Sequence, residues 1–177
     1  KLTVTDTLCS NVYATTSSMN IFYLDKDPAK AAKLQYNKHV VKMILESAQM
    51  LCTAHHHYAE TNYPMVEVPY KKAHYNHPST KWVRESESNY TWLYDHMMAL
   101  GEEYTRRYGK KHLSIIKCSL PLSHKPLGIP QTKFTQPPQA MPDEYKSECS
   151  LQAYWNYYIG DKSHIANTKT EKIYEER

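Results

Sequence analysis

Four polar residues whose side chains could do acid–base chemistry share one face of a predicted helix. His39, Lys42, Glu46 and Gln49 follow one another at steps of three, four and three residues, and Gln35 lies four residues before them. Such steps return to the same side of an α-helix. An imidazole, an ammonium group and a carboxylate in line could move protons or supply a nucleophile. The alternative is a solvent-exposed polar face, in which a Lys–Glu pair adds only about 0.2–0.5 kcal/mol.

The helix that must position these residues is predicted from Asp27 to Tyr58. Asp27 suits the N-cap, and Pro28 suits the first turn. Apolar residues recur with a helical period on the face that we expect to enter the core. These residues are Leu34, Val41, Ile44, Leu45, Ala48 and Leu51.

A second long helix is predicted from His77 to Tyr108, with Gly109 as a left-handed residue at its end. Its beginning is polar and basic, with Lys81 and Arg84 following His77. Helix N-termini attract phosphate groups. His77, Lys81 and Arg84 are therefore candidate contacts to nucleic acid, although plain helix capping explains the same residues equally well.

The rest of the chain adds one loop and two helices. A short helix is expected over His112–Cys118, and Pro121–Pro142 holds six prolines in 22 residues, which predicts a loop. A last helix is predicted over Ser147–Ile159, ended by Gly160. No set of paired strands is recognisable. The predicted fold class is therefore mainly α, a compact three-helix single domain with a long Pro-rich loop.

The ends of the chain differ in composition from its middle. Residues 1–18 are rich in Ser and Thr and precede Met19, which resembles a natural start. We expect residues 1–18 to be a leader, a fusion-derived segment or upstream read-through without ordered structure. Residues 19–165 are expected to form the single α-helical domain, and residues 166–177 a charged tail.

The overall charge and the aromatic content permit a nucleic-acid partner. The formal net charge is +4, and sixteen tyrosines stand against two phenylalanines. Lys110 and Lys111 form one further basic cluster, while Trp155 and Lys162 belong to an aromatic and basic segment near the C-terminus. Basic groups interleaved with aromatic rings are typical of nucleic-acid binding. The alternative is that tyrosine merely replaces phenylalanine in the core.

Several classes of protein are excluded by missing patterns. No apolar run approaches the roughly 18 residues of a membrane span, and no secretory signal is visible, so a cytoplasmic location is expected. Consecutive His55, His56 and His57 point in different directions from a helix, and no two of the four cysteines are close. Phosphate-binding glycine motifs and GxSxG are missing. We expect neither a metal nor a cofactor.

The order of these parts resembles the pyrimidine-dimer DNA glycosylase family, to which the endonuclease V of T-even phages belongs. Asn37-Lys38-His39 is followed seven residues later by Glu46, Arg107-Tyr108-Gly109 is similar to the end of the family's second long helix, and Tyr154–Lys162 looks like its C-terminal aromatic segment. The resemblance covers roughly Met19 to Lys162 without the Pro-rich loop. The chain is also similar to small open reading frames of phages.

The resemblance implies roles for particular residues. In the family, an α-amine exposed by removal of the initiator Met attacks the sugar and forms an imine, and a helix-borne Glu assists. By position the amine would belong to Asn20 and the carboxylate to Glu46, with His39 as a DNA contact. The family places arginines where this chain has Leu45 and Gln49. Lys42 is the alternative amine if Asn20 has no free one.

These observations predict a DNA N-glycosylase with lyase activity that acts on a damaged or modified base in double-stranded DNA, as a monomer. Glu46, Asn20 and Lys42 are the candidate catalytic residues. One alternative is a phage protein that binds nucleic acid without chemistry, and another is a protein-interaction module with a Tyr-rich surface. The candidate DNA contacts are His39, Gln49, His77, Lys81, Arg84, Lys110, Lys111, Trp155 and Lys162.

Overall fold

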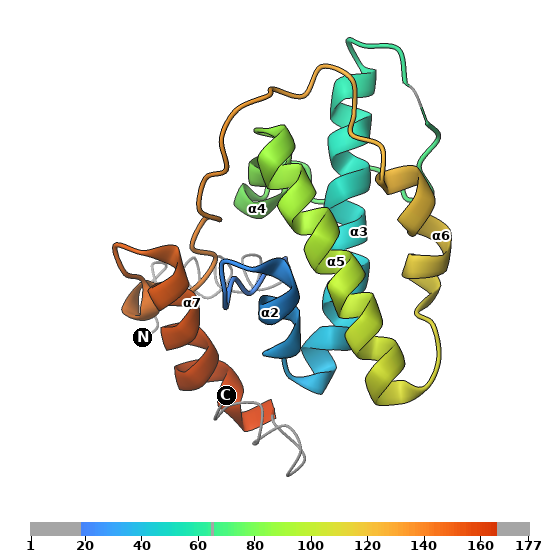
Figure 1. Cartoon of the computed structure of the whole chain (residues 1–177). Helices are drawn as coiled ribbons and strands as arrows, with labels where there is room; N and C mark the ends of the chain where they lie inside the picture. Colours follow the sequence, from blue (N-terminus) through green and yellow to red (C-terminus); the bar gives the residue numbers. More distant parts are fainter. Residues whose placement is uncertain (1–18, 65, 166–177) are drawn as a thin grey trace, which may run out of the picture.

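Helices form the framework of the protein in the computed structural model, which describes residues 19–64 and 66–165 (Figure 1). These described residues contain no strand, which confirms the mainly α fold. The predicted leader (1–18) and charged tail (166–177) lie outside them. The α-helices within the described residues are α2 (Pro28–Lys33), α3 (Asn37–Ala59), α4 (Pro78–Val83), α5 (Glu87–Tyr108), α6 (Leu113–Leu122) and α7 (Ser150–Tyr157).

The helix predicted over Asp27–Tyr58 is in fact two helices, α2 and α3. The chain leaves the helical conformation at Tyr36, where ψ is 155°. The N–H of Tyr36 donates to the hydroxyl of Tyr158 at 2.7 Å instead of to a carbonyl one turn earlier. The guanidinium of Arg107 donates to the carbonyl oxygen of Gln35 at 2.8 Å. Because distant side chains satisfy these backbone groups, local helical periodicity alone could not reveal the break.

The helix predicted over His77–Tyr108 is likewise divided, into α4 and α5. Arg84 adopts φ −91° and ψ 0°, and the chain is extended at Ser86. The Ser86 hydroxyl then accepts the N–H of Asn89 at 3.0 Å as an N-cap of α5. The capping serine was readable in the sequence, but the helical apolar spacing on both sides concealed it.

Other predicted helix ends are confirmed. The carboxylate of Asp27 accepts the N–H of Ala29 at 2.8 Å, as expected of an N-cap. Gly109 has φ 72°, and its N–H donates to the carbonyl of Thr105 at the end of α5. Gly160 is different: it lies inside a π-helical turn (Tyr158–Lys162) that prolongs α7, so it does not stop the last helix.

The buried face of α3 is only partly the predicted one. Ile44, Ala48 and Leu51 are fully buried, whereas Val41 and Leu45 are 39% and 40% exposed, so their assignment to the core was wrong. The polar residues His39 and Glu46 are instead buried, at 8% and 5% exposure. His39 and Glu46 therefore do not belong to a solvent-exposed face, although Lys42 between them has a side chain that is 58% exposed.

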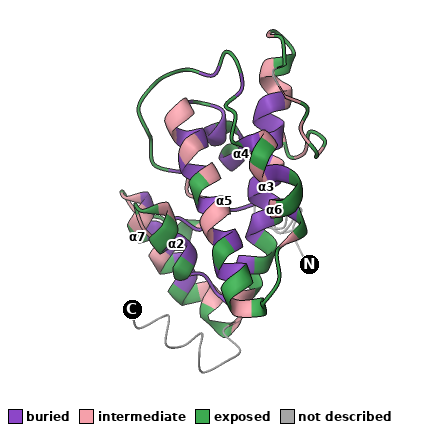
Figure 2. Ribbon diagram, turned by 45° about the vertical axis from the view of Figure 1, so that its right-hand side comes forward, coloured by how far each residue is buried: buried purple, intermediate pink, exposed green. Residues whose placement is uncertain are grey.

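The two long helices α3 and α5 lie along each other and form the centre of the molecule (Figure 1). α2 packs on α5, α4 packs on α3, and α6 lies beside both long helices. At Gly101 a Cβ atom would stand only 2.7 Å from the side chain of Ile115, so the missing side chain lets α6 approach α5 closely. Figure 2 shows the buried residues on the inner sides of these helices and exposed residues on their outer sides.

The Pro-rich segment connects α6 to α7 along the surface and is a loop from Ser123, as predicted. Its first two residues, Pro121 and Leu122, still belong to α6. Both the N–H and the carbonyl of Thr135 are bonded, to the side chains of Asn89 and Trp82, so α4 and α5 fix the path of the loop. No helix within the described ranges is long and apolar enough to cross a bilayer.

Candidate active site

The carboxyl group of Glu46 is the centre of the site. It projects from α3 into the protein, with its side chain 7% exposed. Its Oε2 accepts the backbone N–H of Asn20 at 3.3 Å, and the ammonium of Lys42, one turn earlier, lies 3.6 Å from Oε1. Burial raises the pKa of Glu46 to about 7, although Lys42 and the Asn20 N–H both act to lower it. A carboxyl with this pKa can donate and accept a proton near neutral pH.

Asn20 is fixed by its own side chain. The side-chain oxygen accepts the N–H groups of Ile21 and Phe22 at 2.7 and 2.9 Å, and the side-chain nitrogen donates to the carbonyl of Ala140 at 3.0 Å. Phe22 has φ 54°, a conformation that costs a non-glycine residue of order 1–3 kcal/mol and persists only when neighbours enforce it. These bonds direct the backbone nitrogen of Asn20 at Glu46. Met19, directly before it, is 1% exposed.

His39, on the same helix as Glu46, is surrounded by aromatic side chains. Its ring stacks on Phe22, with centroids 4.2 Å apart, and its Nδ1 is 2.9 Å from the hydroxyl of Tyr158. Burial lowers the pKa of His39 to about 3, and the charges of Lys162 and Lys42 act in the same direction. His39 is therefore neutral at physiological pH and can offer a hydrogen bond to DNA but no ion pair.

Several predicted DNA contacts gather around this N-terminal half of α3. Lys162 lies close enough to His39 to affect its pKa, and its ammonium stands 5.0 Å from the ring centre of Tyr157. Lys110 and Lys111 are exposed and precede His112, whose Nε2 is 3.1 Å from the carbonyl oxygen of Val41 on α3. The fold thus brings together cationic residues from α3, the α5–α6 turn and the C-terminal turn. They are Lys42, Lys110, Lys111 and Lys162.

Gln49 and Trp155 are less clearly parts of this site. Gln49 is half-buried on α3, one turn beyond Glu46. Trp155 is also half-buried, and it packs against the hydrophobic core from α7. No contact of either side chain joins it to Glu46 among those found in the described residues, so their part in DNA binding stays a prediction.

The predicted basic contacts around α4 lie elsewhere: Arg84, the residue that ends α4, is anchored to the C-terminal half of α3. The hydroxyl of Tyr58 donates to the carbonyl of Arg84 at 2.6 Å. The Arg84 guanidinium is turned inward. It donates to the backbone carbonyl of Tyr75 at 2.8 Å and lies 4.0 Å from the centre of the Tyr75 ring. His77 caps α4 by accepting the N–H of Ser79, while Lys81 is exposed. The fold does not join these three predicted contacts to Glu46.

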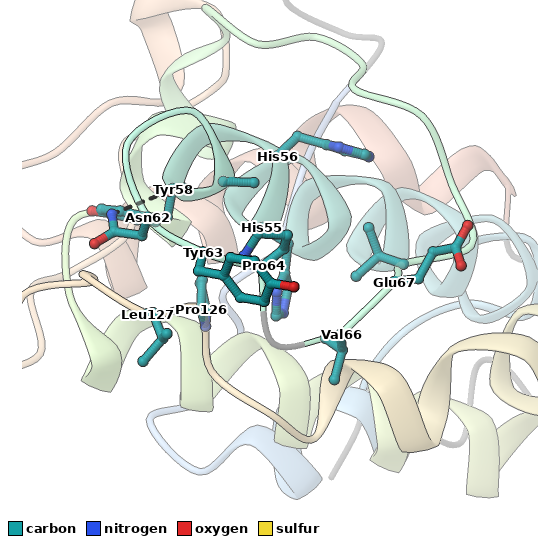
Figure 3. Close-up of a pocket in the computed structure, with 12 residues that line it drawn as sticks. His55, His56, Tyr58, Asn62, Tyr63, Pro64, Val66, Glu67, Pro126 and Leu127 are labelled. Atoms are coloured by element: carbon teal, nitrogen blue, oxygen red, sulfur yellow. Dashed lines mark hydrogen bonds between the residues drawn. The ribbon is translucent and has the colours of Figure 1, made fainter.

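The C-terminal half of α3 also lines a cavity of about 440 Å³ (Figure 3). Its histidines are engaged by the protein, His55 with the hydroxyl of Tyr90 at 2.8 Å and His56 with the carbonyl of Tyr70 at 2.8 Å. Burial lowers the pKa of His55 to about 4. Within the described ranges, no group of three or more His, Cys, Asp or Glu side chains is arranged to hold a metal ion.

Three contributors to the site were missed from the sequence. Phe22 and Tyr158 hold His39, and the carbonyl of Ala140 holds Asn20. Ala140 is separated from Asn20 by 120 residues. No local pattern signals such contacts. Only the crowding of aromatic residues in Tyr154–Tyr158 suggested that some of them face a site.

Taken together, the helical fold and a buried carboxyl group with Lys42 beside it define a small α-helical protein with a candidate acid–base site. Residues 19–116, more than half of the chain, match the model of the pyrimidine dimer DNA glycosylase family. The protein belongs to this family, which confirms the resemblance and assigns it, at family level, to the DNA glycosylases. Neither the curated proteins nor the solved structures gave a match.

Proposed function

We propose that the protein excises a damaged or modified base from double-stranded DNA and then cleaves the strand at the resulting abasic site. The observation that carries this proposal is the 3.3 Å distance from the backbone nitrogen of Asn20 to Oε2 of Glu46. Cleavage of the peptide bond before Asn20 would turn that nitrogen into a primary amine. An α-amine titrates at about 7.7–8.0, which suits a nucleophile near neutral pH.

The chemistry then follows from the two groups. The amine attacks C1′ of the damaged nucleotide, the bond from C1′ to the base breaks, and protonated Glu46 supplies a proton to the departing base. As the bond from C1′ to O4′ breaks, one proton of the attacking amine passes to O4′, and a protonated imine remains between the Asn20 nitrogen and C1′. The Glu46 carboxylate next removes a proton from C2′, and the 3′ phosphate leaves. A pKa of about 7 suits Glu46 to both steps.

Lys42 is the alternative source of the amine. Its Nζ is 3.6 Å from Oε1 of Glu46, so it could form the same imine without cleavage of the chain. The side chain is 58% exposed, however, and a lysine becomes nucleophilic mainly when it is desolvated. This exposure favours Asn20.

Borohydride trapping tests the proposal. Chains starting at Asn20 and at Lys1 are mixed with duplex DNA that contains an abasic site or a lesion, and reduction converts an imine into a stable cross-link. We expect the Asn20 chain to give a cross-link that mass spectrometry locates at its terminal nitrogen. A cross-link at Lys42 would transfer the role to that residue.

Glu46→Gln and the matched control Glu60→Gln complete the experiment. Glu60 is exposed and follows the far end of α3, so its substitution should leave cleavage unchanged. Full activity of Glu46→Gln, together with no cross-link in either chain, would contradict the proposal. Salt-dependent binding without cleavage would then point to a DNA-binding protein without chemistry.

A further inference from the structure

The outer face of α6 carries large apolar side chains that nothing in the described structure covers. Leu113, Ile116 and Leu120 are 59%, 61% and 75% exposed, and they recur at helical spacing. The inner face explains why α6 holds this orientation: Ser114, Cys118 and Leu122 are buried, and Ile115 packs on Gly101. The exposed face is therefore fixed outward by the packing of the opposite side.

This apolar face continues toward the candidate active site. Val41 and Leu45 on α3 are 39% and 40% exposed, and the carbonyl of Val41 is 3.1 Å from Nε2 of His112, the residue before α6. Leu45 directly precedes Glu46. Five residues from Val41 to Glu46 correspond to about 7.5 Å along a helix axis. The apolar band, which comprises Val41 and Leu45 on α3 and Leu113, Ile116 and Leu120 on α6, thus extends to the helical turn that carries Glu46.

The charge around the band selects the kind of partner. From Gly109 to Leu122, the turn before α6 and α6 itself, the chain has three lysines and no Asp or Glu. Lys110 and Lys111 precede the band, and Lys117 is exposed on the same face of α6. An acidic protein surface or a polyanion complements this charge. The neighbouring Glu46 site, whose proposed substrate is DNA, favours the polyanion.

We propose that α6 is a DNA wedge: Ile116 and Leu120 enter the minor groove at the damaged step and occupy space between unstacked bases, while Lys110, Lys111 and Lys117 contact the flanking phosphates. Minor-groove proteins use isoleucine and leucine side chains in this way to unstack and kink DNA. The proposal rests on the proposed action on DNA and adds to it the element that opens the duplex for Glu46.

The test uses the full chain and a short duplex that contains a tetrahydrofuran abasic-site analogue, which cannot form an imine. A neighbouring 2-aminopurine reports loss of base stacking. We expect Ile116→Ser/Leu120→Ser to abolish most of the fluorescence increase and to weaken binding about tenfold, with an unchanged salt dependence. Lys117→Gln should keep the fluorescence increase at saturation and lower the salt slope by about one.

Leu127→Ser is the matched control, because Leu127 is 46% exposed but lies outside α6 and lines the cavity far along α3. It should behave like the unchanged protein.

Wild-type fluorescence and affinity in the Ile116→Ser/Leu120→Ser variant would overturn the wedge. So would sedimentation showing that the unchanged chain is a dimer and the variant a monomer, since the face would then join two copies. An unstacking signal that depends on Ile116 and Leu120, without imine trapping on a reactive duplex, would support the wedge while contradicting the glycosylase chemistry.

Discussion

The two halves of α3 hold their titratable side chains in different surroundings. In the N-terminal half, Glu46 is buried beside the Asn20 nitrogen, and its pKa is displaced toward neutrality. In the C-terminal half, His55 and His56 are bonded to Tyr90 and to a backbone carbonyl. A titratable group that can gain and lose a proton near neutral pH suits catalysis. A titratable group that is hydrogen-bonded to other parts of the protein stabilises the fold instead.

The comparison is tested most strongly by removing each group in turn. Glu46→Gln should lower the single-turnover rate of strand cleavage about 10²–10⁴-fold, since general acid–base catalysis contributes that much. His55→Gln should leave the rate within about twofold, because that residue does not contact the reacting atoms. Comparable losses in both variants would erase the distinction between the two halves.

The pH dependence of stability sharpens the same contrast. The folded pKa of Glu46, about 7, is above its ordinary value of 4.5, so the folded state favours the protonated form. Stability should therefore fall as pH rises from about 4.5 to 7, by about 3 kcal/mol for this group. Glu46→Gln should lack this decrease. Urea unfolding of both proteins at pH 4.5 and pH 8 measures this difference. The same loss of stability in the unchanged protein and in Glu46→Gln would contradict the prediction.

In the C-terminal half the expected effect is on stability without an effect on chemistry. The hydroxyl of Tyr90 donates to the carbonyl of Leu122 at 2.7 Å and lies 2.8 Å from Nε2 of His55. Tyr90→Phe leaves buried polar groups without this partner and should lower the free energy of unfolding by about 1–3 kcal/mol. Denaturant unfolding and the cleavage rate are measured together. A large loss of rate in a stably folded variant would make this half part of the site.

The smallest expected effects concern single surface lysines. Lys111→Gln should reduce the slope of log affinity against log salt by about 0.9, as expected for one phosphate contact. Lys81→Gln tests the other basic cluster, on α4. If the N-terminal half of α3 is the main DNA surface, the salt slope of Lys81→Gln should differ less from that of the unchanged protein than the slope of Lys111→Gln does. Equal reductions of the slope in both variants, measured by fluorescence-anisotropy titration, would instead extend the DNA surface to α4.

Parts of this molecule could be predicted from the sequence because their causes are local. The N-cap of Asp27, the left-handed Gly109 and the extended Pro-rich segment depend on neighbouring residues alone. The spacing of His39 and Glu46 also predicted that both residues lie on one helix, and both belong to α3. The break between α2 and α3 at Tyr36 and the surroundings of His39 could not be predicted. Both depend on the hydroxyl of Tyr158, which is more than a hundred positions away in the sequence.

The burial of Met19 creates a trade-off between stability and activity. If the chain is cleaved before Asn20, it loses a methionine side chain that is 1% exposed, and loss of a buried methionine side chain costs about 2–5 kcal/mol. The same event places a titratable amine beside Glu46. DNA that enters the vacated space would stabilise the cleaved form by mass action. The melting temperature of a chain starting at Asn20 should therefore rise more steeply with DNA concentration than that of the longer chain.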